Sequence, residues 1–328
     1  ILYFKDADGK GVAEQRKVMF TGFGADPSKP DPEALLNSFV WGLDNRIHGG
    51  SAGIGGVITP VGAPGTSPFA LGHDDFAFDP RTLSISPQAG PAHTGLSFDN
   101  RGRKYVSDLS RPLQTAMYEP GYFARNPFVA KPPGLMDVVN PAPRFFRSAG
   151  ASKVAGGSGH GPGNAGAAAT LMQAAGLMTK ARGGLIYRGN AFPSSYLENA
   201  FIADPEAHII HRAILVEHGL ELFARRPQDE LNTEFLVAND DTFRPTQLIT
   251  GPDGAIYIAD VQTGGESGRI FRIVPENFKQ PKTPQLGKAT TYDLAAMLAQ
   301  ADGWHRDNAA RLLCERRDGR PRHCSRIW

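Results

Sequence analysis

Three aspartates recur at the ends of short apolar segments that resemble one another. Asp108, Asp204 and Asp260 close the sequences YVSD, FIAD and YIAD. Carboxylates that converge repel one another unless a cation lies between them, and Ca²⁺ accepts roughly six to eight oxygen ligands with tolerant geometry. The favoured interpretation is that each aspartate accepts backbone N–H groups within its own loop. The alternative is a calcium site to which the three aspartates and Asn37 supply the oxygens.

Three histidines, His48, His93 and His211, lie in strand-like segments where acid–base chemistry is feasible. A neutral imidazole takes a proton from water or from an alcohol near neutral pH, so each is a candidate catalytic residue. The alternative for each is a packing residue within a strand.

Two arginines are candidates for holding a substrate. Arg212 follows His211 directly, and Arg244 precedes the clearest strand-turn-strand unit of the chain. A planar guanidinium can orient an anionic or carbonyl oxygen. For Arg244 the alternative is a salt bridge to Asp240 or Asp241.

The N-terminal segment DADGKG resembles the start of a calcium loop, with Asp6, Asp8 and a later Glu14 as oxygen ligands around a glycine turn. Lys10 stands where a third ligand belongs. A tight turn between two strands is therefore the favoured interpretation, with a second calcium site as the alternative.

Short strands joined by tight turns must position these residues. The clearest unit is residues 246–260, which turns at Asp253-Gly254 and is followed by a strand in residues 268–275. Other copies lie in residues 37–50, 93–108 and 183–215, and outer strands are expected in residues 75–86 and 233–239. A short helix, or alternatively a flexible insertion over one face, is expected in residues 164–178, which are rich in alanine.

Blades of antiparallel strands around an axis leave only short protected edges. We therefore predict an all-β fold, a β-propeller of about five blades or a truncated ring of six, over residues 1–280. A helical hairpin and tail are expected in residues 281–328, with Thr290 or Thr291 as the helix cap. Residues at the starts of inner strands and the ends of second strands are expected to face one pocket.

Composition excludes several classes of function. The 328 residues carry 35 basic and 33 acidic side chains, a net charge of +2, and so offer no basic field for nucleic acid. No apolar run suits a membrane span, and the first residues lack the features of a signal peptide. Cys314 and Cys324 form a disulfide or remain free, and no CxxCH haem motif is present.

Four segments resemble the membrane-bound dehydrogenase family that is similar to sorbosone and soluble quinoprotein glucose dehydrogenases. They read WGLDNRIHGG, SFDNRGRKYVSD, GGLIYRGNAFP and FRPTQLITGPDGAIYIAD, and the later WHRDNAARLLCERRD resembles HEAT-like repeats. The resemblance implies a periplasmic or secreted propeller that binds pyrroloquinoline quinone (PQQ) with Ca²⁺ and oxidises a sugar or alcohol.

Hydrolysis needs fewer groups than a quinone site. A Ca²⁺ that polarises a carbonyl and a histidine that activates water suffice to open a lactone, and six-bladed lactonases are similar in architecture. The first hypothesis is therefore a calcium-dependent hydrolase of a small lactone or related ester. Quinone-dependent oxidation is the alternative, and a carbohydrate-binding propeller without enzymatic activity is the third hypothesis.

Overall fold

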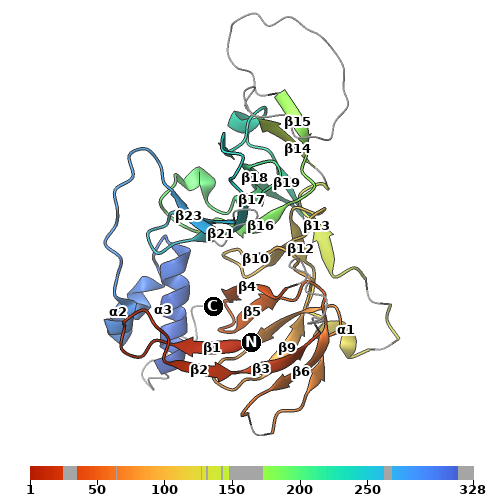
Figure 1. The fold of residues 1–328 in the computed structure, drawn as a ribbon, viewed down its shortest axis with the longest axis vertical. Coiled ribbons are helices and arrows are strands. Elements are labelled where there is room, and N and C mark those ends of the chain that lie inside the picture. The colour runs from red at the N-terminus through yellow and green to blue at the C-terminus, as the bar shows by residue number, and fades with distance from the viewer. Residues whose placement is uncertain are drawn as a thin grey trace, which may run out of the picture.

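The fold is mostly β-sheet with few helices (Figure 1). The computed structural model describes residues 1–24, 35–63, 65–126, 128–130, 132–141, 143–147, 173–219, 221–261 and 268–316. The all-β class expected from the sequence is confirmed at this level. Within these ranges, no helix has the length and apolar character needed to cross a membrane.

The N-terminal residues form a hairpin and a small sheet. Strands β1 (Leu2–Lys5) and β2 (Gln15–Val18) pair antiparallel, and every residue of both strands is exposed. The next sheet contains β3 (Phe20–Phe23), β6 (Gly56–Pro60) and β7 (Phe69–Ala70).

Four larger sheets in the described ranges begin with β4, β10, β16 and β21. The first has the order β4 (Asn37–Trp41), β5 (Ile47–Gly50), β8 (Asp75–Phe78) and β9 (Ile85–Gln88). The second has the order β10 (Gly95–Phe98), β11 (Lys104–Ser107), β12 (Gln114–Ala116) and β13 (Leu135–Asp137). The third contains β16 (Arg182–Ile186), β17 (Ala200–Asp204), β18 (Ile209–His218) and β19 (Glu221–Arg225), with β20 (Leu236–Val237) also on β18. The fourth contains β21 (Pro245–Thr250), β22 (Ile256–Val261) and β23 (Gly268–Ile273), and β14 (Arg144–Arg147) pairs separately with β15 (Gln173–Leu177).

The first strands of the four sheets lie side by side. Strand β10 contacts β4 and β16, and β16 contacts β21. Glycines permit this approach, because a Cβ on Gly95 would lie 2.6 Å from the Gly184 backbone nitrogen. Ser38 Oγ, on β4, donates a hydrogen bond to Gln247 Oε1 on β21 over 3.4 Å. The four inner strands therefore pack closely against one another in the order β4, β10, β16 and β21.

A buried ion pair joins the first and second sheets. Lys104 Nζ, on β11, lies 2.6 Å from Asp75 Oδ2, on β8, and also donates to the Ala89 carbonyl. The Asp75 carboxylate accepts further hydrogen bonds from the backbone N–H groups of Ser51 and Ala92. Both charges are thus satisfied inside the protein, and the segment that precedes His93 is fixed by them.

The helices lie mainly at the C-terminal end. The α-helices are α1 (Gly121–Ala124), α2 (Thr291–Met297) and α3 (Gly303–Arg316), and short 3₁₀ turns span Ser194–Tyr196, Gln228–Glu230 and Leu286–Lys288. Thr290 caps α2 through a capping box with Asp293, as the sequence suggested.

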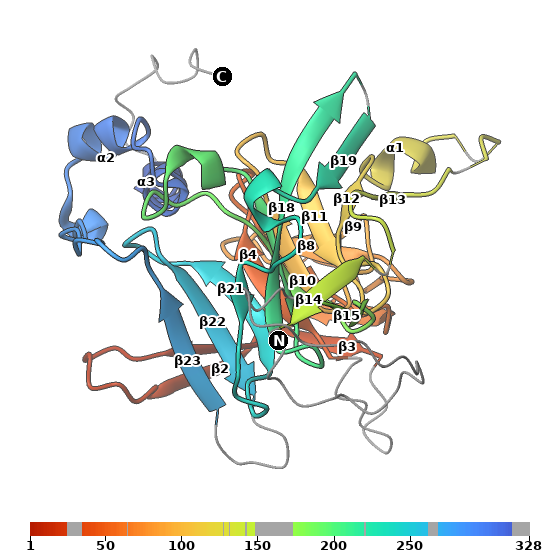
Figure 2. The same ribbon diagram turned by 90° about the horizontal axis from the view of Figure 1, so that it is seen from above.

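Helix α3 lies beside the sheets (Figure 2) and packs against turns of several of them. Its contacts are the Arg188–Asp307 ion pair, a hydrogen bond from Arg306 to Asn100, one between His305 and the Pro252 carbonyl, and the Arg311 guanidinium over Trp41. The helix thereby covers one end of the inner strands.

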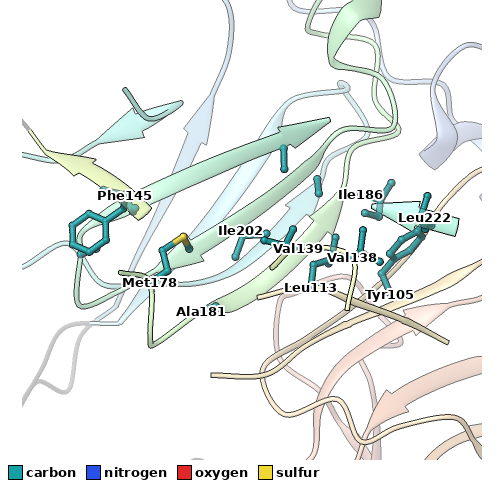
Figure 3. Packing of buried hydrophobic residues seen from close by; sticks show 14 residues of the cluster. Tyr105, Leu113, Val138, Val139, Phe145, Met178, Ala181, Ile186, Ile202 and Leu222 are labelled. Carbon is teal, nitrogen blue, oxygen red and sulfur yellow. The ribbon is translucent and has the colours of Figure 1, made fainter. Parts of the chain in front are cut away.

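The largest part of the core lies between the second and third sheets. Tyr105 and Leu113 from the second sheet pack with Ile186, Ile202 and Leu222 from the third (Figure 3). All five side chains are buried, and this contact holds the strand that carries His211 against its neighbours.

Local patterns predicted many strands but not all. Residues 246–260 and 268–275 contain β21, β22 and β23 as expected, whereas residues 75–86 contain parts of two strands, β8 and β9. The helix expected in residues 164–178 is wrong over its described part, because residues 173–177 pair with β14 as strand β15. Cys324 lies outside the described residues, and the Cys314 thiol accepts a hydrogen bond from Arg81.

Replacing Lys104 with Met is expected to lower the free energy of unfolding by about 3–5 kcal/mol, because it leaves the buried Asp75 carboxylate without its counter-charge. Chemical denaturation followed by circular dichroism measures the change. Lys17→Met, on the exposed strand β2, is the matched control and should change stability by less than about 0.5 kcal/mol. Equal stability of the two variants would contradict a structural role for the pair.

Candidate functional site

His211 and Glu234 form a buried pair on the third sheet. His211 Nδ1 lies 2.7 Å from Glu234 Oε2, and the two side chains are 5% and 0% exposed. Strand β20 brings them together, because it pairs with β18 at Ile209 and Ile210. A carboxylate only accepts hydrogen bonds, so Nδ1 carries the proton and Nε2 keeps its lone pair.

Glu234 is held from two further directions. Arg226 Nη2 lies 2.9 Å from Glu234 Oε1, and the Phe146 backbone N–H donates to the same oxygen over 3.1 Å. The Arg226 guanidinium also stacks over the Phe146 ring at 4.9 Å. The carboxylate therefore has a fixed position from which it orients the imidazole.

His211 lines a cavity of about 370 Å³ that is enclosed by the segment after β13, by β14 and by strands β18 and β19 of the third sheet. No partner for Nε2 exists among the described residues. Arg144 and Arg225 lie on the same cavity as exposed side chains, and within the described ranges neither forms an ion pair. Asn140 and Asn232 add neutral hydrogen-bonding groups. The cavity thus combines an oriented base with two available cations.

This arrangement suits general-base chemistry on a small substrate. An imidazole whose Nδ1–H is held by a carboxylate presents Nε2 to accept a proton from water. A guanidinium at the same cavity stabilises an oxyanion or binds an anionic group of the substrate. Sequence reasoning found His211 but missed Glu234, Arg144 and Arg225. An acidic residue inside the apolar segment TEFLV was the available signal for Glu234.

Arg212 does not join this site. Successive side chains of a strand point to opposite faces, so Arg212 lies on the face opposite His211. Arg212 pairs with Glu230 at 2.8 Å and Asp229 at 3.0 Å, and its guanidinium stacks 4.1 Å from the Tyr196 ring. Arg212 therefore lies outside the His211 cavity, and substrate binding by it stays a prediction.

His93, Asp108 and Asn37 do come together at one end of the inner strands. His93 Nδ1 lies 3.6 Å from Asp108 Oδ2, and both side chains are partly exposed. Asn37 Nδ2 donates to the carbonyls of Ala92 and His93, while its Oδ1 is buried with no partner in the described structure. Asp108 also accepts two hydrogen bonds from Ser110 in its own loop.

Asp204 is bound within its own loop, whereas Asp260 is bound by neighbouring segments of its own sheet. Asp204 Oδ1 accepts the backbone N–H groups of Glu206 and Ala207. Asp260 accepts the Arg244 backbone N–H and the Arg269 Nε–H. In the described ranges these aspartates do not gather with Asp108 into a metal-binding group. The alternative of a brace within the loop therefore describes Asp204, whereas Asp260 joins the segment before β21 to strand β23.

Arg244 pairs with a different carboxylate from those expected. Its Nη1 lies 3.0 Å from Glu206 Oε2 and donates to the Pro205 carbonyl, whereas Asp240 pairs with Arg269. Arg244 therefore forms a salt bridge, as the alternative expected, but with Glu206 and not with Asp240 or Asp241.

His48 lies near the start of β5, next to the turn after β4, and not at the end of a second strand as expected. Its Nε2 lies 3.0 Å from Asp44 Oδ1, and its buried Nδ1 has no partner in the described part of the chain. It lines a separate and larger cleft.

The N-terminal loop does bring its acidic residues together. Ligand atoms of Asp6, Asp8 and Glu14 lie within 4.8 Å of one another, and all three residues are exposed. Asp6 accepts backbone N–H groups of its own turn, and Lys10 Nζ pairs with Asp8. The loop is the turn of the β1–β2 hairpin, and calcium binding there stays a prediction.

Comparisons with known proteins give a family but no activity. No curated protein matches the chain. An auxiliary nutrient-binding protein from Bacteroides thetaiotaomicron is 12% identical with a TM-score of 0.32, over 69% of this chain and 56% of that one. A glucose dehydrogenase is 13% identical with a TM-score of 0.33, over 74% of this chain and 82% of that one. The chain thus spans little more than half the length of the nutrient-binding protein. The family model described as a domain of unknown function, DUF7133, matches residues 1–264, and the chain therefore belongs to that family.

Proposed function

We propose that this chain hydrolyses a small ester or lactone that carries an anionic group, with His211 as general base and Glu234 as the residue that positions it. The observation that carries this proposal is the 2.7 Å contact between His211 Nδ1 and the fully buried Glu234 carboxylate at the edge of a cavity. A cavity of about 370 Å³ suits a small substrate.

The reaction begins when His211 Nε2 accepts a proton from water as the water oxygen adds to the carbonyl carbon. Negative charge then develops on the carbonyl oxygen, and a guanidinium of Arg144 or Arg225 stabilises it while the other binds the anionic group. The tetrahedral intermediate collapses, the carbon–oxygen ester bond breaks, and the imidazolium returns its proton to the leaving oxygen. One water is consumed, and an acid and an alcohol, or one hydroxy acid, are formed.

A calcium-dependent form of this chemistry has less support. Asn37, Asp108, Asp204 and Asp260 do not fit one ion, because Asp204 accepts hydrogen bonds from its own loop and Asp260 accepts them from Arg244 and Arg269 of the fourth sheet. The reaction above therefore uses no metal.

Quinone-dependent oxidation of a sugar or alcohol remains an alternative that the family resemblance implied. The cations expected at PQQ, Arg212 and Arg244, are already paired with Glu230 and Glu206, so these residues do not fit the cofactor. The side-by-side inner strands favour the propeller architecture, which we retain as part of the proposal together with a periplasmic or secreted location.

His211→Asn is expected to lower kcat/KM for 4-nitrophenyl succinate by about 10²–10⁴-fold, because the variant lacks the base. Release of 4-nitrophenol measures the rate, and 4-nitrophenyl acetate, which has no carboxylate, should be the poorer substrate. Glu234→Gln should lower kcat with little change in KM, since it acts through the imidazole.

His218→Asn is the matched control, because His218 lies on the same strand β18 and is exposed. It should leave the rate unchanged. Full activity of His211→Asn, or no hydrolysis by the wild-type protein, would overturn the proposal. Activity lost with chelator would favour the calcium mechanism, and dye reduction that needs added PQQ would favour the dehydrogenase.

The variant Asp204→Asn tests whether Asp204 only accepts hydrogen bonds within its own loop or also binds a metal ion. Burial raises the pKa of Asp204, with backbone hydrogen bonds opposing the shift. A folded-state pKa above the unfolded one means that the aspartate costs stability once it ionises, as pH rises through the raised value. Asparagine keeps an Oδ1 acceptor without the charge. The variant should therefore gain stability relative to wild type at pH 7, and the gain should vanish near pH 3.

Thermal unfolding at both pH values measures this difference. Loss of stability at pH 7 that depends on Ca²⁺ would instead identify Asp204 as a metal ligand.

A further inference from the structure

A second cleft lies between the first and second sheets. It has a volume of about 730 Å³ and is lined by residues of both sheets and by the segment that leads into α1. Asp44 comes from the β4–β5 turn and His48 from β5, Phe98 comes from β10, Tyr118 from the segment after β12 and Tyr122 from α1. The hydrolytic mechanism proposed for His211 uses none of these residues.

The cations of this cleft are already engaged. Lys104 pairs with Asp75, and Arg103 pairs with Asp99 and with Glu217. Arg46 Nη2 donates to the Ala77 carbonyl and to Ser86 Oγ. An anionic ligand would therefore find no free counter-charge among these residues.

Hydrogen-bond acceptors, in contrast, are available. Asp44 is exposed, and although burial opposes the shift, the hydrogen bond and charge of His48 lower its pKa. The Glu119 carboxylate is exposed and has no partner in the described ranges. His48 is 4% exposed, and it serves to hold the Asp44 carboxylate in place at the cleft. A matching ligand must donate several hydrogen bonds.

Aromatic rings supply apolar surface beside these acceptors. The Tyr118 ring packs edge-on against Phe123 with centroids 4.5 Å apart, and its hydroxyl donates to the Pro132 carbonyl, so its orientation is fixed. Tyr122 is 69% exposed, although it is a large aromatic residue. Rings of this kind combine an apolar face with a polar edge and stack on flat ligands.

We propose that this cleft binds a neutral sugar ring. The hydroxyl groups of a sugar supply donors to the exposed carboxylates of Asp44 and Glu119, and the C–H face of the ring matches Tyr122. A cleft with a few polar groups among aromatic side chains is typical of small-molecule sites. The occupant is a free monosaccharide or the terminal residue of a glycan, since the chemistry of the two is shared.

Saturation-transfer difference NMR with D-glucose, D-galactose and D-mannose tests the proposal, and cellobiose distinguishes a glycan end from a free sugar. At least one sugar should bind, and both Tyr122→Ala and Glu119→Gln should raise its Kd about tenfold or more, which corresponds to about 1.4 kcal/mol. Tyr292→Ala is the matched control, because Tyr292 on α2 is 84% exposed and lines none of the described cavities.

His211→Asn should bind the sugar with unchanged Kd, so failure of the hydrolase proposal leaves this result intact. Three outcomes would overturn the sugar site: no signal from any of the sugars, a Kd that is unchanged in Tyr122→Ala, or displacement of the sugar by choline at lower concentration. The last outcome would assign the cleft to an organic cation.

Discussion

The Lys104–Asp75 ion pair is the interaction on which the arrangement of the first two sheets depends. Buried charges are unfavourable unless each finds a counter-charge and its hydrogen bonds, and here two backbone N–H groups and one carbonyl complete the set. Asp75 lies on β8 of the first sheet and Lys104 on β11 of the second, so the ion pair links the two sheets. It therefore fixes how those sheets lie against each other and orders the segment before His93, and Lys104 also lines the larger cleft.

Successive side chains of β18 point to opposite faces of the third sheet, which places the candidate base on one face and a charged cluster on the other. His211 faces a cavity, whereas Arg212 lies in a cluster with Glu230 and Tyr196. The charged cluster on one face thus helps to hold the strand whose other face presents the imidazole. The same logic explains why Glu234 has three donors: a carboxylate that orients a base must itself be immobile.

Features set by nearby residues could be predicted from the sequence, and features set by distant pairing could not. The Asp253-Gly254 turn and the Thr290 cap are local, and both were predicted. His211 was a candidate on residue type alone, but Glu234 reaches it only because β20 pairs with β18. The equivalent aspartates were grouped by their place in a repeat, whereas loop N–H groups and Arg269 satisfy Asp204 and Asp260 separately.

Helix α3 has a consequence for how this fold can vary. The helix contacts the turns that contain Asn100 and Pro252 and the end of strand β4 at Trp41. All three contacts can form at once only because neither turn is long enough to push the helix away. An insertion in any of them would lift the helix from the others. Within the family, we expect length differences to accumulate at the opposite end of the inner strands, which is also where a fused tag or inserted domain would be tolerated best.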